Sequence, residues 1–178
     1  MAKKLSILIC SLEKRHNLLA RLMESLEPQL TPQVEVLTEI DDGRMKIGHK
    51  RNLLLKGAQG DYISFIDDDD LISDRYVPLV LDAVESSPDC CGIRGIVKRR
   101  NQYKREFRHS ILYSSWYEYQ GIYYRCPNHL NPVKRELALK VKFANISKGE
   151  DKDYSLRLYP LLKSEFFIGT ILYYYLTG

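Results

Sequence analysis

Four consecutive carboxylates, Asp67–Asp70, follow directly on a short apolar run, Tyr62–Ile66. The run is rich in β-branched and aromatic residues, which predicts a strand buried on both faces of a parallel sheet. Because alternate side chains of an extended chain share a face, Asp67 and Asp69 should point the same way. Carboxylate oxygens are ligands that Mg²⁺ or Mn²⁺ prefers, and open α/β sheets bind ligands at the carboxyl ends of their strands. The stretch therefore predicts a site for a metal ion and phosphate groups.

A plainer interpretation is a solvated turn in which Asp70 or Ser73 caps the helix that follows. Capping gives a role to one acidic residue only. It leaves the remaining carboxylates repelling one another at the end of a strand, so we favour the metal and phosphate site.

The bulk properties indicate a single globular domain over residues 1–178. The net charge of +4 suits anionic substrates without requiring nucleic acid. The four cysteines form no CxxC pair, which argues against a zinc site or a disulfide framework and favours a reducing cytoplasm.

Neither end of the chain has the pattern of a membrane segment. The apolar run after Lys3 and Lys4 is too short for a signal peptide, and the aromatic stretch 166–176 is shorter than a membrane span. That stretch could be a buried strand, a final helix or a peripheral membrane contact, and we favour burial.

Apolar periodicity predicts an alternation of strands and helices, which is typical of an α/β fold with a mostly parallel sheet flanked by helices. The strands expected beside 62–66 are 5–10, 34–40 and 93–97, and the helices are 18–26, 47–57, 73–86 and 154–162.

The helix expected over 47–57 begins with basic residues. A cation in a first turn opposes the helix dipole, so Arg51 should have a partner elsewhere. The candidates are a nucleotide phosphate, one of the acidic clusters, or a surface carboxylate.

After residue 97 the composition becomes basic and then aromatic. The stretch 98–108 carries six lysines and arginines and should be a hairpin or loop, while 113–124 holds Trp116 and five tyrosines. A solvated charged face and core packing are the common uses of such residues. A nucleic-acid-binding surface over 98–124 is the alternative function, and it could extend to a transferase acting on modified DNA.

Five short motifs occur in a characteristic order: a first strand with a polar end at Ser11, then Asp41-Asp42-Gly43, Arg51-Asn52, Phe65–Asp70 and Gly149-Glu150-Asp151. In this order the chain resembles the family 2 glycosyltransferases, nucleotide-sugar-dependent enzymes of the Rossmann-like GT-A fold. The resemblance covers most of residues 5–160. It implies a nucleotide-sugar-binding half, 1–97, and an acceptor-binding half, 98–178.

The resemblance implies a nucleotide site. Ser11 would border the base, and Asp41 or Asp42 would accept a hydrogen bond from it. Arg51 would steady the nucleotide or its diphosphate, and Asp68 belongs to the same nucleotide-binding set. The expected donor is a UDP-sugar.

The resemblance also implies a metal site for Mn²⁺ or Mg²⁺. Asp67 and Asp69 match its Asp-x-Asp motif, with Asp69 the direct ligand and Asp67 nearer the ribose or the metal's waters. His129, in a proline-flanked loop, either completes this metal site, contacts the diphosphate, or is a hydrogen-bonded structural histidine.

In the late acidic motif, Asp151 would be the general base, with Glu150 as its neighbour or substitute. The implied reaction is hexosyl or N-acetylhexosaminyl transfer to an acceptor hydroxyl with inversion. The Gln-x-x-Arg-Trp motif of processive members is absent, which indicates a single transfer. A nucleotidyltransferase shares the aspartates, but it does not explain the Glu150-Asp151 motif.

Overall fold

One mixed β-sheet runs through the computed structural model, which describes residues 2–99 and 104–177. The strands in these ranges are β1 (Leu5–Leu12), β2 (Val34–Asp41), β3 (Tyr62–Phe65), β4 (Leu71–Ile72), β5 (Cys90–Arg99), β6 (Lys104–His109), β7 (Tyr117–Tyr119), β8 (Ile122–Arg125), β9 (Val133–Lys134) and β10 (Glu165–Thr177). Their order is β2-β1-β3-β9-β5-β6-β8-β7, and β10 pairs with β5 and β4. The longest registers, β1 with β2 and β10 with β5, are parallel. The predicted α/β class is confirmed.

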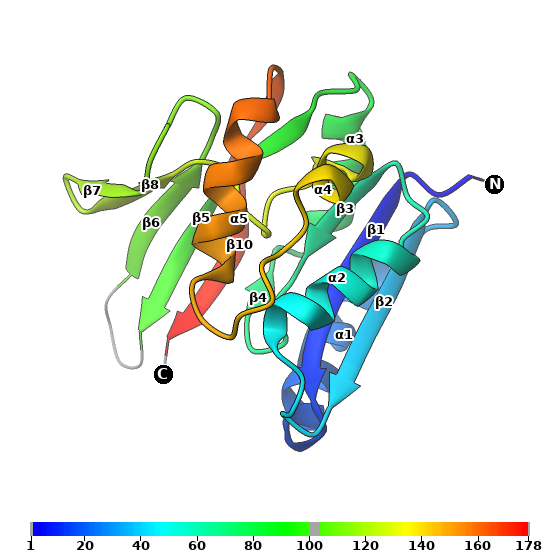
Figure 1. Cartoon of the computed structure of the whole chain (residues 1–178). Helices are drawn as coiled ribbons and strands as arrows, with labels where there is room; N and C mark the ends of the chain where they lie inside the picture. Colours follow the sequence, from blue (N-terminus) through cyan, green and yellow to red (C-terminus); the bar gives the residue numbers. More distant parts are fainter. Residues whose placement is uncertain (1, 100–103, 178) are drawn as a thin grey trace.

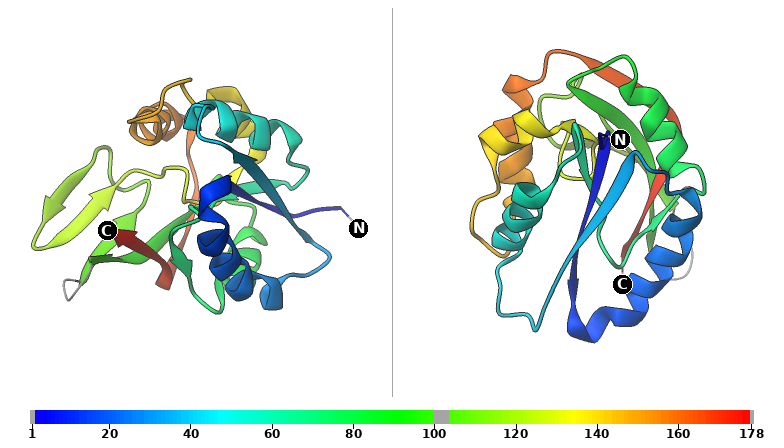
Figure 2. Two further views of the ribbon diagram at one scale, coloured as in Figure 1. Left: turned by 90° about the horizontal axis from the view of Figure 1, so that it is seen from below. Right: turned by 90° about the vertical axis from the view of Figure 1, so that its right-hand side faces the viewer.

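Helices cover both faces of this sheet (Figure 1). They are α1 (His16–Leu26), α2 (Ile47–Gly57), α3 (Tyr76–Val84), α4 (Arg135–Val141) and α5 (Glu150–Leu158), with 3₁₀ turns η1 (Glu13–Arg15), η2 (Glu27–Gln29) and η3 (Tyr159–Leu161). Figure 2 shows α1 and α3 on one face of the sheet and α2, α4 and α5 on the other.

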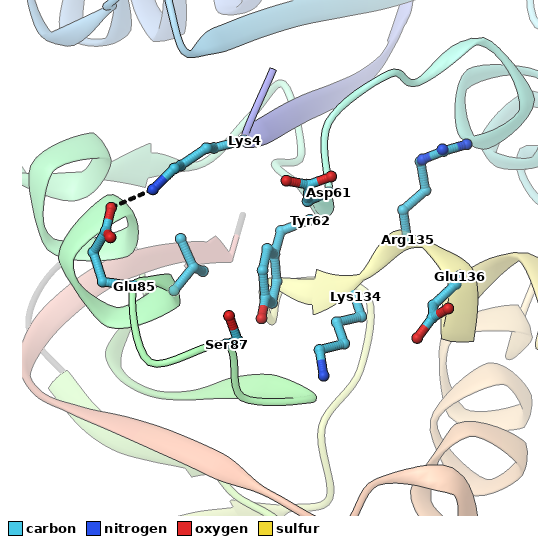
Figure 3. Close-up of a pocket in the computed structure, with 9 residues that line it drawn as sticks. Lys4, Asp61, Tyr62, Glu85, Ser87, Lys134, Arg135 and Glu136 are labelled. Carbon is cyan, nitrogen blue, oxygen red and sulfur yellow. Dashed lines mark hydrogen bonds and ion pairs between the residues drawn. The ribbon is translucent and has the colours of Figure 1, made fainter. Parts of the chain in front are cut away.

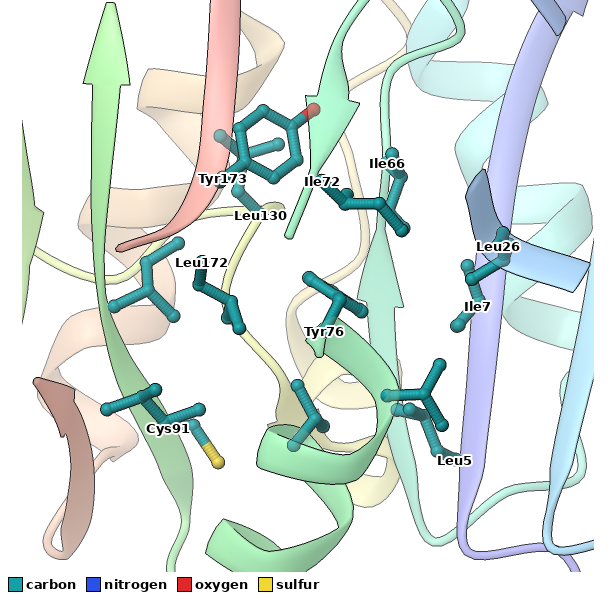
Figure 4. Packing of buried hydrophobic residues seen from close by; sticks show 14 of the residues in the cluster. Leu5, Ile7, Leu26, Ile66, Ile72, Tyr76, Cys91, Leu130, Leu172 and Tyr173 are labelled. Atoms are coloured by element: carbon teal, nitrogen blue, oxygen red, sulfur yellow. The ribbon is translucent and has the colours of Figure 1, made fainter. Parts of the chain in front are cut away.

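The apolar core divides into two clusters because neighbouring side chains of β1 point to opposite faces. Leu5 and Ile7 pack with α1 and α3 (Figure 4), while Leu8 packs with α2, α4 and α5. Both clusters are closed to solvent, so β1 is buried on both faces, as its unbroken apolar sequence predicts.

The chain after β3 corrects one prediction. The strand ends at Phe65, and the backbone N–H of Asp70 donates to the carbonyl of Asp67 at 3.2 Å, so the aspartates form a turn. Their side chains therefore do not alternate as they would in an extended chain. We call Asp67–Asp70 the aspartate turn.

The helix predicted over 73–86 is shorter, because the chain at its expected start is hydrogen-bonded to the sheet. β4 pairs with β10, and the N–H of Ser73 donates to the carbonyl of Leu172 at 3.0 Å. The helix α3 consequently starts at Tyr76, with no side-chain cap from Asp70 or Ser73.

The helix predicted over 154–162 begins earlier, at Glu150. Gly149 precedes it with a φ of +78°, a conformation that suits glycine, and Glu150, Asp151 and Asp153 occupy the first turn. Carboxylates at this end interact favourably with the helix dipole. The late acidic motif thus lies on a helix and not in a loop.

The basic and aromatic stretch forms two antiparallel pairs of strands. β5 and β6 pair from Lys98 opposite Lys104 to Ile93 opposite His109, as predicted for a hairpin. Arg100 and the side chain of Arg99 lie outside the described residues. β7 and β8 are joined by Gln120 and Gly121, both with positive φ, the geometry of a tight two-residue hairpin.

The aromatic stretch near the end of the chain is a strand, but the burial that we favoured for it holds only in part. β10 runs parallel to β5 and buries Leu172 and Tyr173 completely, while Phe166 and Tyr175 remain about two-fifths exposed (40% each). Within the described ranges, no helix is both long enough and apolar enough to cross a membrane.

Candidate active site

A cavity of about 590 Å³ lies at the carboxyl ends of β1 and β3. It is bounded by the end of β1, the first turns of α2, the aspartate turn, the segment before α5, and the end of β10. We call it the donor cavity. The cavity lies where open α/β sheets bind ligands, and its lining is charged.

Asp67 is held between two basic side chains. Its Oδ1 accepts from the Arg51 guanidinium at 3.2 Å, and its Oδ2 lies 3.3 Å from Nε2 of His129. Burial alone would raise the pKa of Asp67, but His129 and Arg51 outweigh it and lower that pKa well below its usual range. Asp67 is therefore an ionised carboxylate whose position in the cavity lining is fixed by Arg51 and His129.

His129 lies behind Asp67 and is not part of the cavity lining. Its side chain is 6% exposed, and its Nδ1 has no hydrogen-bond partner among the described residues. In this arrangement His129 contacts Asp67 and not the cavity itself.

Asp68 connects the aspartate turn to β1 and to η1. It is 2% exposed and accepts hydrogen bonds from Ser11 Oγ at 2.6 Å and from Arg15 Nη1 at 2.8 Å. Because both of its oxygens are in use, Asp68 fixes the turn and the adjacent wall of the cavity.

Asp69 is the most exposed carboxylate of the turn, at 41%. Its one ion pair in the described structure is with Arg15, at 3.2 Å. Burial and the neighbouring Asp67 raise the pKa of Asp69. A positive charge placed in the cavity would relieve this unfavourable negative charge.

Asp70 points away from the cavity and toward β10. It accepts from the Tyr173 hydroxyl at 2.8 Å and from the Leu176 N–H at 2.7 Å. The Tyr173 hydroxyl also accepts from the Asp67 N–H at 3.1 Å. Hydrogen bonds from β10 thus hold the aspartate turn on the side away from the cavity.

Asp41 closes the loop that leads into α2. Its carboxylate pairs with Lys50 and accepts from the N–H groups of Gly43 at 3.0 Å and Met45 at 2.8 Å. Asp42 pairs with Arg44 at 3.0 Å, and neither aspartate lines the cavity. The structure brings Ser11, Arg51 and the aspartate turn together, but it leaves these two aspartates at the periphery.

The two residues of the late acidic motif have different surroundings. Glu150 is 7% exposed, lines the cavity and pairs with Arg51 at 3.1 Å. Asp151 is half-buried, has no ion pair in the described structure, and accepts from the N–H of Lys152 at 2.7 Å. Of the partners considered for Arg51, the structure shows acidic residues: Asp67 of the aspartate turn and Glu150 of the late acidic motif.

Sequence reasoning missed Lys50, Arg15 and Tyr175, which all line the cavity. Lys50 is 2% exposed and donates to the carbonyl of Ser11 at 2.6 Å as well as pairing with Asp41. The basic first turn of α2 was a usable signal for Lys50. Arg15 and Tyr175 reach the site only through tertiary packing, which a local pattern does not reveal.

A second cavity, of about 400 Å³, lies at the opposite, amino-terminal ends of β1 and β3 (Figure 3). Two of its lysines are paired, Lys4 with Glu85 and Lys134 with Asp89. It is remote from the aspartate turn and adds nothing to this site.

Residues 41–143, more than half of the chain, match the family model described as glycosyl transferase family 2. The chain belongs to the family 2 glycosyltransferases, as the motifs predicted. No curated protein matches the sequence.

Solved structures of S. aureus TarS share this fold. The TarS 1–349 complex with UDP has a TM-score of 0.71 at 15% identity and covers 98% of this chain and 61% of its own. The complex with UDP-GlcNAc has a TM-score of 0.68 at 15% identity and covers 98% and 59%, respectively. The chain therefore spans less than two thirds of the TarS chains that it matches. The likeness confirms the GT-A fold.

Proposed function

We propose that the protein is a metal-dependent glycosyltransferase that moves a hexosyl or N-acetylhexosaminyl group from a UDP-sugar to an acceptor hydroxyl. Family membership supports the reaction class. Structures of the similarly folded TarS contain UDP and UDP-GlcNAc, which supports the choice of donor.

The observation that carries this proposal is the charge pairing in the donor cavity. Its lining includes three cations, and each is already bound to carboxylates: Lys50 to Asp41, Arg51 to Asp67 and Glu150, and Arg15 to Asp68 and Asp69. A diphosphate entering this cavity would meet no uncommitted cation in the lining. A divalent metal ion would supply the missing positive charge.

The chemistry of Asp69 fits such an ion. Mg²⁺ and Mn²⁺ are commonly held by one or two carboxylates together with substrate phosphates. The described residues contain no cluster of three or more histidine, cysteine or acidic side chains around one point, so the phosphates would have to complete the coordination. When bound, the ion would stabilise the charge of the departing diphosphate as a Lewis acid.

In the transfer itself, Asp151 takes the proton from the acceptor hydroxyl. The acceptor oxygen forms a bond to the anomeric carbon, the bond between that carbon and the diphosphate breaks, and its electron pair leaves with UDP. Attack opposite the leaving group inverts the anomeric centre in a single transfer. Glu150, held by Arg51, is the less available carboxylate of the pair.

Calorimetric titration of UDP, with and without Mn²⁺, tests the donor site. We expect UDP binding that requires Mn²⁺ and is lost in Asp69→Asn. Asp74→Asn, an exposed change close in sequence to the turn, is the control and should bind as the wild type does. Metal-independent binding would overturn the metal role, and tight binding of GDP alone would change the donor.

A further inference from the structure

Arg125, the last residue of β8, is a half-buried cation without a carboxylate partner. Among the described residues its guanidinium makes no ion pair and no hydrogen bond. It lies instead over the ring of Trp116, 4.3 Å from the ring centroid, and 6.0 Å from that of Tyr123. Aromatic faces stabilise a cation but use none of its five N–H donors.

Other arginines of the neighbouring strands are neutralised by glutamates. Arg94 and Arg108 both pair with Glu106, at 2.9 and 2.5 Å, and Arg105 pairs with Glu118 at 2.5 Å. These pairs also reduce the positive charge that a nucleic-acid surface over 98–124 would need. Arg125 differs from them because its fork of donors is available to a ligand.

A cavity of about 240 Å³ opens at Arg125. Its lining is aromatic and apolar apart from Arg125, His109 and Thr177, and includes Phe107, Tyr123, Leu130 and Tyr175. Tyr175 lines the donor cavity as well, so the two cavities adjoin at one side chain. The smaller cavity is therefore placed beside the expected position of the transferred sugar.

Arg125 is connected through Trp116 to α5, the helix that carries the proposed base Asp151. The indole N–H of Trp116 donates to Ser155 Oγ at 3.1 Å, and Ser155 lies one turn after Asp151 on α5. Burial lowers the pKa of Arg125, and Asp151 is the foremost of the groups that oppose this shift. Arg125 and Asp151 thus lie near enough for their charges to interact, although Asp151 does not line the smaller cavity.

We propose that this cavity is the acceptor subsite and that it takes a hydroxyl-bearing sugar or polyol that also carries an anionic group, a phosphate or a carboxylate. The anion pairs with Arg125, whose planar fork matches either group, and the hydroxyl turns toward Asp151. This inference rests on the proposed function, because it assigns the acceptor of that reaction.

Calorimetric titration with three probes tests the subsite: glucose 6-phosphate, glucuronate and glucose, without UDP or metal. Hydrogen bonds to a charged group predict that the anionic probes bind at least about tenfold more tightly than glucose. Arg125→Gln should remove the preference, and Arg125→Lys should keep part of it. Arg108→Gln, a paired arginine of β6, is the matched control and should keep it in full. A preference for only one anion supports the proposal and identifies the group.

Equal binding of all three probes, no binding of either anionic probe, or an anion preference that survives in Arg125→Gln would overturn the proposal. UDP and Mn²⁺ binding, measured separately in Arg125→Gln, should equal that of the wild type. A weaker UDP affinity in this variant would assign Arg125 to the donor and also overturn the acceptor role. Failure of the wild type to bind UDP would remove the proposed function alone, because the three-probe comparison does not involve UDP.

Discussion

Two aspartates separated by a single residue have opposite electrostatic surroundings. The His129 and Arg51 contacts lower the pKa of Asp67, whereas burial and Asp67 itself raise the pKa of Asp69. Carboxylates whose environments separate their pKa values have separate tasks in many active sites. Here Asp67 is committed to protein partners, and Asp69 is the carboxylate available to a ligand.

The general base is best tested by a change that preserves shape. Asp151→Asn should reduce the rate of transfer by about 10²–10⁴-fold, because the amide cannot accept the proton of the acceptor hydroxyl. UDP affinity should be unchanged, since Asp151 does not line the donor cavity. Steady-state transfer rates and UDP titration measure the two effects.

Asp153→Asn is the matched control, because Asp153 lies on the same helix and pairs with Arg157 away from the cavity. It should retain the wild-type rate. Retained turnover in Asp151→Asn would refute the assignment of the base.

Local sequence predicted residue identities at the site better than it predicted their contacts. The motifs indicated the aspartate turn, Arg51 and the Glu150-Asp151 pair, because each stands at a strand end or a helix start. The bonds that fix them join distant parts of the chain, such as Asp68 with Ser11 and Asp70 with Tyr173. The periodic pattern of apolar residues along the sequence contains no information about such long-range hydrogen bonds.

Among the elements, α2 positions most of the cations of the donor cavity. Gly48, in its first turn, lies against the backbone of the segment before α5: a Cβ there would come within 1.8 Å of the carbonyl oxygen of Ala144. The close approach brings Lys50 and Arg51 to the cavity. Glycine is needed here for space.

Gly48→Ala should therefore destabilise the fold by about 1–3 kcal/mol, the usual range for overpacking, and should weaken UDP binding. Gly57→Ala, at the other end of the same helix, is the control: its Cβ would meet Leu37 at 3.6 Å, an ordinary contact. Alanine at that position should be neutral or slightly stabilising. Denaturant unfolding of both variants gives the comparison, and equal stabilities would contradict the packing argument.

The elements of the first half could be predicted because each carries its own apolar pattern. For the second half, the places of the strands in the sheet could not be predicted, because β9 and β10 enter it between or beside strands made much earlier in the chain. The beginning of α5 was misplaced for a different reason. Its first turn is acidic and polar, and the apolar period starts only at Tyr154.

At the scale of the whole molecule, one sheet joins the proposed nucleotide-binding and acceptor-binding halves. β5, β6 and the loop before β9 meet around His109, which is 1% exposed and lies 3.2 Å from Oδ1 of Asn131. Asn131 in turn donates to the carbonyl of Cys91 at 2.9 Å. This junction ties residues of both proposed halves together; that residues 1–178 form a single domain stays a prediction.

Acid should weaken this junction. Burial, followed by the charge of Arg125, lowers the pKa of His109 well below its ordinary value, so the unfolded chain binds a proton at a higher pH than the folded chain does. The free energy of unfolding should therefore fall as the pH drops below about 6.5, by up to about 1.4 kcal/mol per pH unit from this group.

Denaturant titrations across this pH range give the slope. His109→Gln should flatten it, whatever the variant does to stability at neutral pH. His16→Gln, an exposed change at the start of α1, should follow the wild-type curve. An unaltered slope in His109→Gln would show that the histidine does not carry this effect.

The bracing of the aspartate turn by β10 has a consequence for how the protein is made. Tyr173 and Leu176 hold Asp70 from a distance of more than a hundred residues along the chain. A nascent chain that has not yet released residue 176 from the ribosome has all of its first core elements but lacks the support behind the turn. Under the proposed function, such a chain would not yet bind the donor, and binding would become possible only once β10 has joined the sheet.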